Sequence, residues 1–171
     1  MGVRANRGGM EIRPYDAERD ADGLWRLKEA FELGLGENTG GDDKAEQYAG
    51  KVTDEYRRRY LAWVERCVAS DERCLTVAHD GESVVGYVFV LPDDLALIWD
   101  AAILNEIYVR VDHRGTGVAD DLMAAAVDLA ADQDLPLDRL VLDVDRENDR
   151  AQGFYARHGF EHWGEMVARK L

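Results

Sequence analysis

The spacing of apolar residues predicts that the chain begins with a strand and an amphipathic helix. Met10–Tyr15 alternates apolar and polar residues next to a proline, as a short strand does. A helix follows, capped by Asp20 or Asp22. Its apolar residues fall on one helical stripe: Leu24, Leu27, Phe31 and Leu35.

The next region predicts a loop, a helix and a hairpin. Glycines and acids favour a loop over Gly36–Lys44, and Thr53 or Asp54 then caps a second helix. The apolar positions of that helix are Tyr56, Tyr60, Trp63, Val64 and Cys67. Cys74–Ala78 and Ser83–Leu91 are β-rich and flank an Asp-Gly turn, so they predict an antiparallel pair.

The second half of the chain alternates strands and helices. Ala102–Val111 predicts a strand, and a glycine turn leads from it into a helix that ends before Pro136. That helix has an apolar face of Val118, Leu122, Met123, Ala126, Leu129 and Ala130. Leu140–Val144 is apolar enough for a buried parallel strand, Asn148–His158 predicts a helix, and Glu161–Leu171 a last extended segment.

This order predicts an α/β domain with a mixed, strongly twisted sheet. A right-handed crossover places the strands before and after the glycine turn's helix parallel in one sheet. The turn then lies at the carboxyl end of the strand that finishes near Val111, where open α/β sheets bind ligands. We expect a mobile tail over residues 1–9 and one domain over residues 10–171.

The net charge of the chain limits the classes of ligand that it is expected to bind. The chain has 35 acids and 21 bases, a formal net charge of −14, which argues against nucleic acid. Because the acids are spread along the chain, we hypothesise a halophilic source. In about 1 M salt the Debye length is roughly 3 Å, so this surface repels an anionic ligand less than in dilute buffer.

Cysteine and apolar content place the chain in the cytoplasm. Cys67 and Cys74 make no metal-ligand pattern, so we expect two small core residues in a reducing compartment and no metal site. No run approaches the roughly 20 apolar residues of a membrane span, so we expect no membrane partner.

The glycine turn is the strongest chemical signal. His113–Met123 reads HRGTGVADDLM, and a glycine turn before a helix gathers backbone N–H groups that bind anions. The stretch lacks the ending of a Walker loop and the spacing of a dinucleotide fingerprint. What remains is R-x-x-G-x-A, formed by Arg114, Gly117 and Ala119. The turn is either an anion site or a structural helix cap.

Two blocks together resemble the GNAT N-acetyltransferase superfamily. The first is IYVRVDHRGTGVADDLM, with Arg, two residues, Gly, one residue and Ala. The second block has the pattern N-x-x-A-x-x-F-Y-x-x-x-G-F. Its matching residues are Asn148, Ala151, Phe154, Tyr155, Gly159 and Phe160. The resemblance covers Ala102–Phe160 closely and implies a sheet of about six to seven strands flanked by helices, with splayed parallel strands at the cofactor site.

The resemblance implies acetyl-CoA as the co-substrate. The backbone N–H groups that would hold its pyrophosphate belong to Gly115, Thr116, Gly117, Val118 and Ala119. Arg114 adds a charge-assisted contact. The backbone near Ile107 and Val109 would pair with the pantetheine arm in the gap between the splayed strands, and Asn148 would hydrogen-bond the same cofactor.

Two side chains are candidate catalysts. By resemblance, Tyr155 protonates the departing thiolate, and Glu106 is the candidate base that deprotonates the amine. Tyr155 is otherwise a core aromatic beside Phe154, and Glu106 an ordinary polar residue that strand alternation can turn away from the site. His113 and His158 are read as structural or solvent-facing.

The expected reaction is direct attack of an amine on acetyl-CoA in a ternary complex. The acceptor is a small molecule, a peptide N-terminus or a lysine, with Glu37, Asp42 and Asp43 as candidate attractors of a cation. Asp120, in the first helical turn, is expected to repel the pyrophosphate. A homodimer stays open. The alternatives are a non-catalytic acyl-CoA-binding regulatory module and an interaction domain without cofactor.

Overall fold

A computed structural model describes residues 4–6, 9–38 and 42–171, and the side chains of residues 9–35 and 43–171. The strands are β1 (Arg4–Asn6), β2 (Met10–Pro14), β3 (Leu75–His79), β4 (Val84–Val90), β5 (Ala102–Val109) and β6 (Leu140–Val141). The α-helices are α1 (Ala17–Asn38), α2 (Asp42–Lys51), α3 (Asp54–Ser70), α4 (Asp93–Ala96), α5 (Val118–Asp132) and α6 (Asp149–Arg157). Two short 3₁₀ turns cover Glu72–Cys74 and Val111–His113.

The sheet follows chain order, β1-β2-β3-β4-β5-β6. Strands β1 to β5 pair antiparallel with their neighbours and form the continuous part. β6 joins β5 in parallel through two pairs only, Ala102 with Leu140 and Ile103 with Val141. The expectation of six to seven strands is therefore too high for the continuous sheet, which has five strands with β6 attached at one end of β5.

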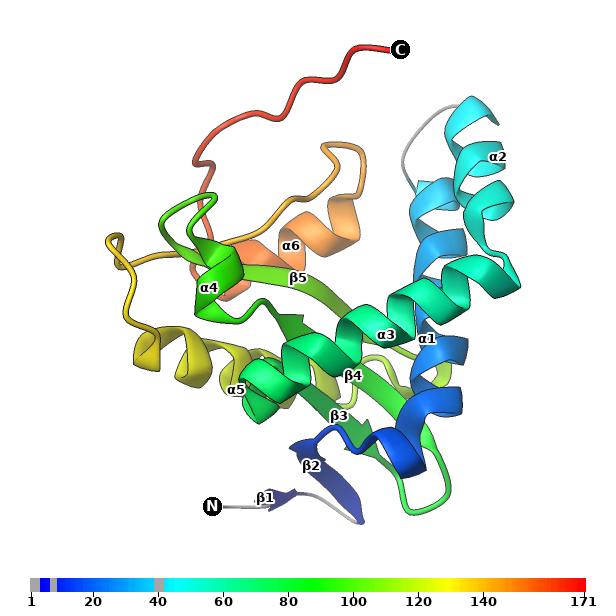
Figure 1. The fold of residues 1–171 in the computed structure, drawn as a ribbon, viewed down its shortest axis with the longest axis vertical. Helices are drawn as coiled ribbons and strands as arrows, with labels where there is room; N and C mark the ends of the chain where they lie inside the picture. The colour runs from blue at the N-terminus through cyan, green and yellow to red at the C-terminus, as the bar shows by residue number, and fades with distance from the viewer. Residues whose placement is uncertain (1–3, 7–8, 39–41) are drawn as a thin grey trace.

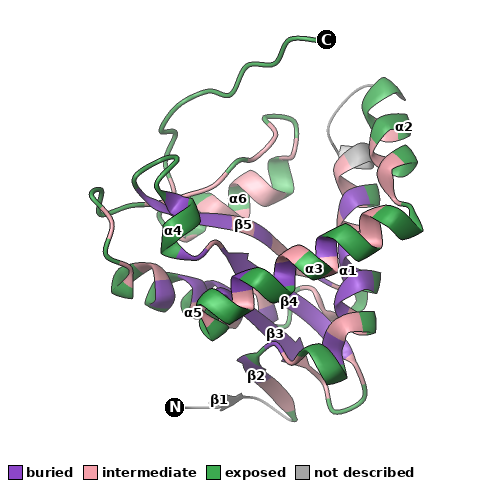
Figure 2. Ribbon diagram, viewed as in Figure 1, coloured by how far each residue is buried: buried purple, intermediate pink, exposed green. Residues whose placement is uncertain are grey.

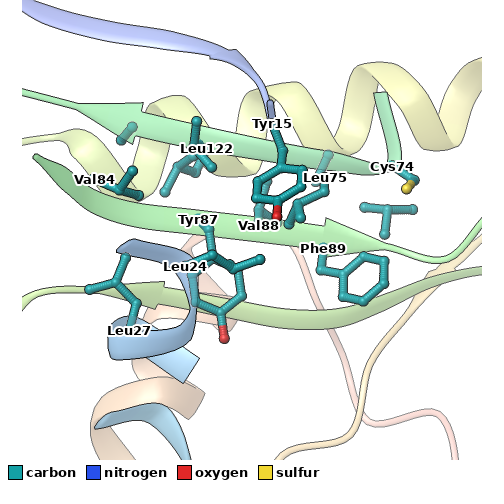
Figure 3. Close-up of a cluster of buried hydrophobic side chains, with 14 of the residues drawn as sticks. Tyr15, Leu24, Leu27, Cys74, Leu75, Val84, Tyr87, Val88, Phe89 and Leu122 are labelled. Carbon is teal, nitrogen blue, oxygen red and sulfur yellow. The ribbon is translucent and has the colours of Figure 1, made fainter. Parts of the chain in front are cut away.

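Helices cover both faces of this sheet (Figure 1). α1 and α3 lie on one face and α5 on the other. Every residue of β4 is buried, so this central strand is the middle of the core, as Figure 2 shows in purple. In Figure 3, Tyr87 of β4 points toward Leu24 of α1, while Leu122 comes from α5. The mixed α/β architecture predicted from the sequence is confirmed.

Several local predictions are confirmed with their physical cause. The Thr53 side chain accepts a hydrogen bond from the Tyr56 N–H at 3.1 Å and caps α3. The Asp-Gly turn joins β3 and β4 into the expected antiparallel pair. Cys67 and Cys74 are buried free thiols in the core, and burial raises the pKa of Cys74 to about 12.

Other local predictions are wrong. Gly36–Lys44 was expected to be a loop, but α1 continues to Asn38 and α2 begins at Asp42, since Ala45, Tyr48 and alternating charges favour a polar surface helix. The strand expected over Leu140–Val144 has two residues, because β5 diverges from it after Ile103.

The two ends of the chain also differ from expectation. The last extended segment expected over Glu161–Leu171 pairs with no strand among the described residues and is exposed along its length, green in Figure 2. At the other end, residues 1–3 and 7–8 of the mobile tail expected over residues 1–9 lie outside the described residues, and Arg4–Asn6 pairs with β2. Within the described part of the chain, no helix is both long and apolar enough to cross a bilayer.

Candidate functional site

The gap between β5 and β6 exposes one backbone edge of β5. The Arg110 N–H donates to Val85 O at 2.8 Å, so Arg110 faces β4, and alternation turns the backbone groups of Ile107 and Val109 away from β4. β6 pairs only as far as Ile103, so it does not reach these groups. No strand pairs with the Ile107 backbone on this side, and Val109 O accepts from Arg114 Nε, so the stretch that the resemblance assigns to the pantetheine arm is open at Ile107 and at the Val109 N–H.

The glycine turn brings the N-terminus of α5 to the end of that open edge. Gly117 is the N-cap of α5 with φ 90°, and Gly115 has φ 74°, so both occupy the left-handed region that favours glycine. Gly117 has no side chain to cap the helix, so the N–H groups of Val118, Ala119 and Asp120 meet no acceptor within the described part of the chain, and the first helical bond runs from the Asp121 N–H to Gly117 O at 3.1 Å. The Thr116 hydroxyl donates to His113 O at 2.5 Å and fixes the turn. The geometry suits an anion.

Asp120 does not face this anion site as a free charge. Its carboxylate accepts from His158 Nε2 at 2.8 Å and lies 2.9 Å from Arg157 at the end of α6. Burial acts to raise the pKa of Asp120, but the contacts with His158 and Arg157 outweigh it and hold the pKa below its ordinary value. The acid that the sequence analysis expected to repel a pyrophosphate instead ties the start of α5 to the end of α6.

Arg114 lies at the open edge of β5, and sequence reasoning did not single out a second arginine, Arg150, whose pKa responds to it. Arg114 Nε donates to Val109 O at 3.0 Å, and its guanidinium lies 5.3 Å from the centre of the Tyr108 ring. Arg150 lies close enough to Arg114 that burial and this second guanidinium lower the pKa of Arg150. Among the described residues neither arginine has a carboxylate within 4.0 Å. Because the chain is so acidic, two arginines without a carboxylate nearby indicate a binding site for an anion.

Helix α6 supplies the remaining predicted residues. Asn148 caps this helix, its side-chain oxygen accepting from the Ala151 N–H at 3.1 Å. Tyr155 lies between the rings of Phe154 and Phe160, whose centres are 5.5 and 5.6 Å from its own. Burial raises the pKa of Tyr155 to about 12, so its hydroxyl carries a proton at neutral pH.

Glu106 points from β5 toward α1 and α3 and is buried. One carboxylate oxygen pairs with the ammonium of Lys28, and the other accepts from the Tyr60 hydroxyl at 2.7 Å. Burial acts to lower the pKa of Lys28, but the carboxylates of Glu106 and Glu32 outweigh it and hold the pKa above its ordinary value. Glu106 is thus one member of a buried charge cluster, which we define as Lys28, Glu32, Lys51, Tyr60 and Glu106.

Sequence reasoning missed this cluster, although the chain carried a signal. Lys28 falls four residues after Leu24 and three before Phe31, on the apolar stripe of α1. A charge in such a place requires a buried partner, and Glu32 follows at the next helical turn. Glu106, by contrast, is far away in the sequence, and only the fold brings it to Lys28.

The remaining candidates either lie outside the described side chains or are found at the surface. The side chains of Glu37 and Asp42 lie outside the described residues, and Asp43 is exposed. His113 lies in a surface group, its Nδ1 2.9 Å from Asp112 and its Nε2 3.4 Å from Asp80. No three potential metal ligands gather anywhere in the described part of the chain.

Comparisons with known proteins agree with this geometry. Residues 41–160 match the acetyltransferase (GNAT) family. An uncharacterised N-acetyltransferase of Mycobacterium bovis is 38% identical over 96 residues, which is 56% of this chain and 56% of that relative. The chain therefore aligns with little more than half the length of that relative.

Solved structures share the fold at low identity. One is the PaiA N-acetyltransferase from Thermoplasma acidophilum in complex with coenzyme A, with TM-score 0.69 and 17% identity over 90% of this chain and 91% of that one. Another is an aminoglycoside N-acetyltransferase in complex with CoA, with TM-score 0.67 and 17% identity over 98% and 97% of the two chains. On the family match and the fold together, the chain belongs to the GNAT family of acetyltransferases.

Proposed function

We propose that the chain transfers an acetyl group from acetyl-CoA to a primary amine by direct attack in a ternary complex. The observation that carries the proposal is the uncapped N-terminus of α5 at Gly117, which lies at the end of an unpaired edge of β5. Backbone donors at a helix start suit a diphosphate, and an open strand edge suits an extended amide-bearing arm. Coenzyme A has both parts, and two of the fold neighbours hold it.

Each part of the proposed cofactor site has a separate task. The N–H groups from Gly115 to Ala119 would donate to the diphosphate, and Arg114 and Arg150 would supply positive charge beside it. The backbone of Ile107 and Val109 would hold the pantetheine arm, with Asn148 facing it from the start of α6. A β5 backbone N–H would also donate to the thioester oxygen as that oxygen gains charge.

Acetyl-CoA supplies an activated acetyl thioester, and the protein would manage two protons. Tyr155 would donate its hydroxyl proton to the leaving sulfur as negative charge develops there. Glu106 would accept the proton of the amine through a water or through the Tyr60 hydroxyl, because both of its oxygens are already bonded inside the fold.

Thiol release in the presence of an amine library tests the proposal. The parent should release CoA with at least one amine, and Tyr155→Phe should lose about 100-fold in turnover while its affinity for CoA stays the same. Tyr15→Phe is the matched control, because burial raises the pKa of Tyr15 to about 12 as well, yet Tyr15 lies in the core. CoA binding without turnover of any amine would instead support the regulatory module.

A further inference from the structure

Helix α2, which the sequence analysis took for a loop, lines a cavity. The cavity has a volume of ≈ 370 Å³ and is lined by Lys44, Gln47, Tyr48 and Lys51. In Figure 1, α2 stands beside the C-terminal half of α1, and its Lys44 ammonium lies 2.9 Å from Asp145 on the connection between β6 and α6. This open hollow on α2 shares Lys51 with the buried charge cluster.

Lys51 lines this cavity together with Tyr48, and its ammonium also contacts two residues that do not line the cavity, Glu32 and Tyr56. Its ammonium lies 2.7 Å from Glu32 Oε2, 4.8 Å from the centre of the Tyr48 ring and 5.4 Å from that of Tyr56. A carboxylate together with aromatic faces is the surrounding that recognises an alkylammonium ion. The Lys51 side chain is still 39% exposed, so solvent reaches the same place.

The charge of the cluster explains why this place needs a cation. Glu32 and Glu106 are both buried, and they share the single ammonium of Lys28. These three groups carry a net charge of −1, and Lys51 brings the sum to zero. Lys51 is the one contact that the described residues give Glu32 Oε2, so a bound ammonium would have to replace this ion pair.

We propose that Glu32, Tyr48 and Tyr56 form a binding site for a primary alkylammonium group of the acceptor, and that Lys51 occupies it when no acceptor is bound. This inference rests on the proposed function and names its substrate class. An ammonium held by a carboxylate is a poor nucleophile, so the bound group anchors the acceptor while a second amine reacts. The acceptor is therefore a molecule with two or more primary amines on a flexible chain.

The opposite assignment, an acceptor carboxylate held by Lys44 and Lys51, is weaker on the same contacts. Each lysine already pairs with a carboxylate of the protein, Lys44 with Asp145 and Lys51 with Glu32. A carboxylate added here would come close to buried Glu32. Both lysines are therefore already paired and offer no free charge to an added anion. An added cation, by contrast, can take the place of Lys51 at Glu32.

Calorimetric binding of 1-aminopentane, without acetyl-CoA, tests the site separately from catalysis. Lys51→Met removes the internal competitor and should bind the amine at least about tenfold more tightly than the parent. Lys44→Met is the matched control, since Lys44 lines the same cavity but does not touch Glu32, and it should match the parent. 1-Pentanol, which has no charge, should show no gain with either variant.

Two further results decide the proposal. In the Lys51→Met background, Tyr48→Ala should weaken binding of the amine about threefold, and this variant disturbs only a cavity wall. Equal affinity of the parent and Lys51→Met would overturn the proposal, as would pentanoate binding that is lost in both lysine variants. Because no acetyl-CoA is present, such a failure leaves the proposed acetyl transfer untouched, and absent thiol release leaves this binding result standing.

Discussion

The two ends of the site, the glycine turn and the buried charge cluster, are built from different parts of the protein. The turn uses backbone groups of consecutive residues, and its key position, Gly117, has no side chain. The cluster uses side chains from α1, α2, α3 and β5, which are far apart in the sequence. The glycine turn would bind a ligand through main-chain N–H groups, and the buried charge cluster would bind one through its charged side chains.

This difference shows which changes each end tolerates. A backbone site depends on local conformation, so it survives an acidic surface as long as nearby acids, such as Asp120, are paired elsewhere. A buried side-chain cluster depends on having every charge matched, because an unpaired ion in the interior is costly. Substitutions should therefore damage the cluster through stability and the turn through cofactor affinity.

Lys28→Met should give the largest effect. It leaves the buried carboxylates of Glu32 and Glu106 without their shared ammonium, and breaking a buried ion pair in this way costs about 3–5 kcal/mol. Urea unfolding measures the loss. The double variant Lys28→Met/Glu106→Gln should recover part of the stability, since one of the two buried charges is then gone. A loss below about 1 kcal/mol would contradict a tightly matched cluster.

Gly117→Val should come next and act on the cofactor. A β-branched residue at φ 90° is strained by about 1–2 kcal/mol, and relief of that strain would move the N–H groups at the start of α5. We expect CoA to bind at least about tenfold more weakly, measured by calorimetry. Gly9→Val, at φ 101° with open space around its Cβ, is the control for strain alone. Equal effects of both variants on affinity would remove the turn from the cofactor site.

Salt concentration should affect the glycine turn and the buried charge cluster differently, but less strongly than the two substitutions above. With 35 acids against 21 bases, the surface repels an anionic cofactor, and molar KCl shortens the Debye length to roughly 3 Å. Between dilute buffer and molar KCl, we expect the affinity for CoA to rise severalfold. We expect the melting temperature to rise by several degrees over the same range. The internal ion pairs of the cluster are shielded from salt, so the loss caused by Lys28→Met should stay the same. Stability that does not rise with KCl would argue against a halophilic source.

Asp120→Asn should have the smallest effect, and it has a defined pH dependence. The pKa of Asp120 is lower in the folded chain than its ordinary value of 3.8. Its contribution to stability is therefore complete above about pH 4 and is lost as the pH falls through the folded-state pKa. Unfolding titrations should show a shallower acid loss for Asp120→Asn than for the parent, with CoA affinity at neutral pH changed by less than about threefold. A large gain in affinity would mean that Asp120 does repel the diphosphate.

The sequence predicted the turn well and the cluster poorly, and locality explains why. The spacing of Arg114, Gly117 and Ala119 fixes a backbone conformation within a few residues, and the cap at Thr53 is equally local. The cluster depends on a contact between Lys28 and Glu106, 78 residues apart, which no local pattern contains. The sequence therefore predicts Glu106 as a candidate general base but does not predict its buried partners, Lys28 and Tyr60.

The secondary structure divides in the same way. The hairpin of β3 and β4 and the buried face of α5 follow from periodicity, so they were predicted correctly. β6 was predicted too long because its length is set by divergence from β5, a property of the sheet and not of Leu140–Val144 itself. α2 was missed because its glycine-rich approach favours a loop and its apolar content is low.

The most direct measurement of the central claim is a crystal structure of the chain with coenzyme A bound. We predict the diphosphate within hydrogen-bond distance of the N–H groups of Val118 and Ala119, and the pantetheine arm along the open edge of β5 at Ile107 and Val109. A structure with coenzyme A bound elsewhere, and with the start of α5 facing solvent alone, would contradict the account.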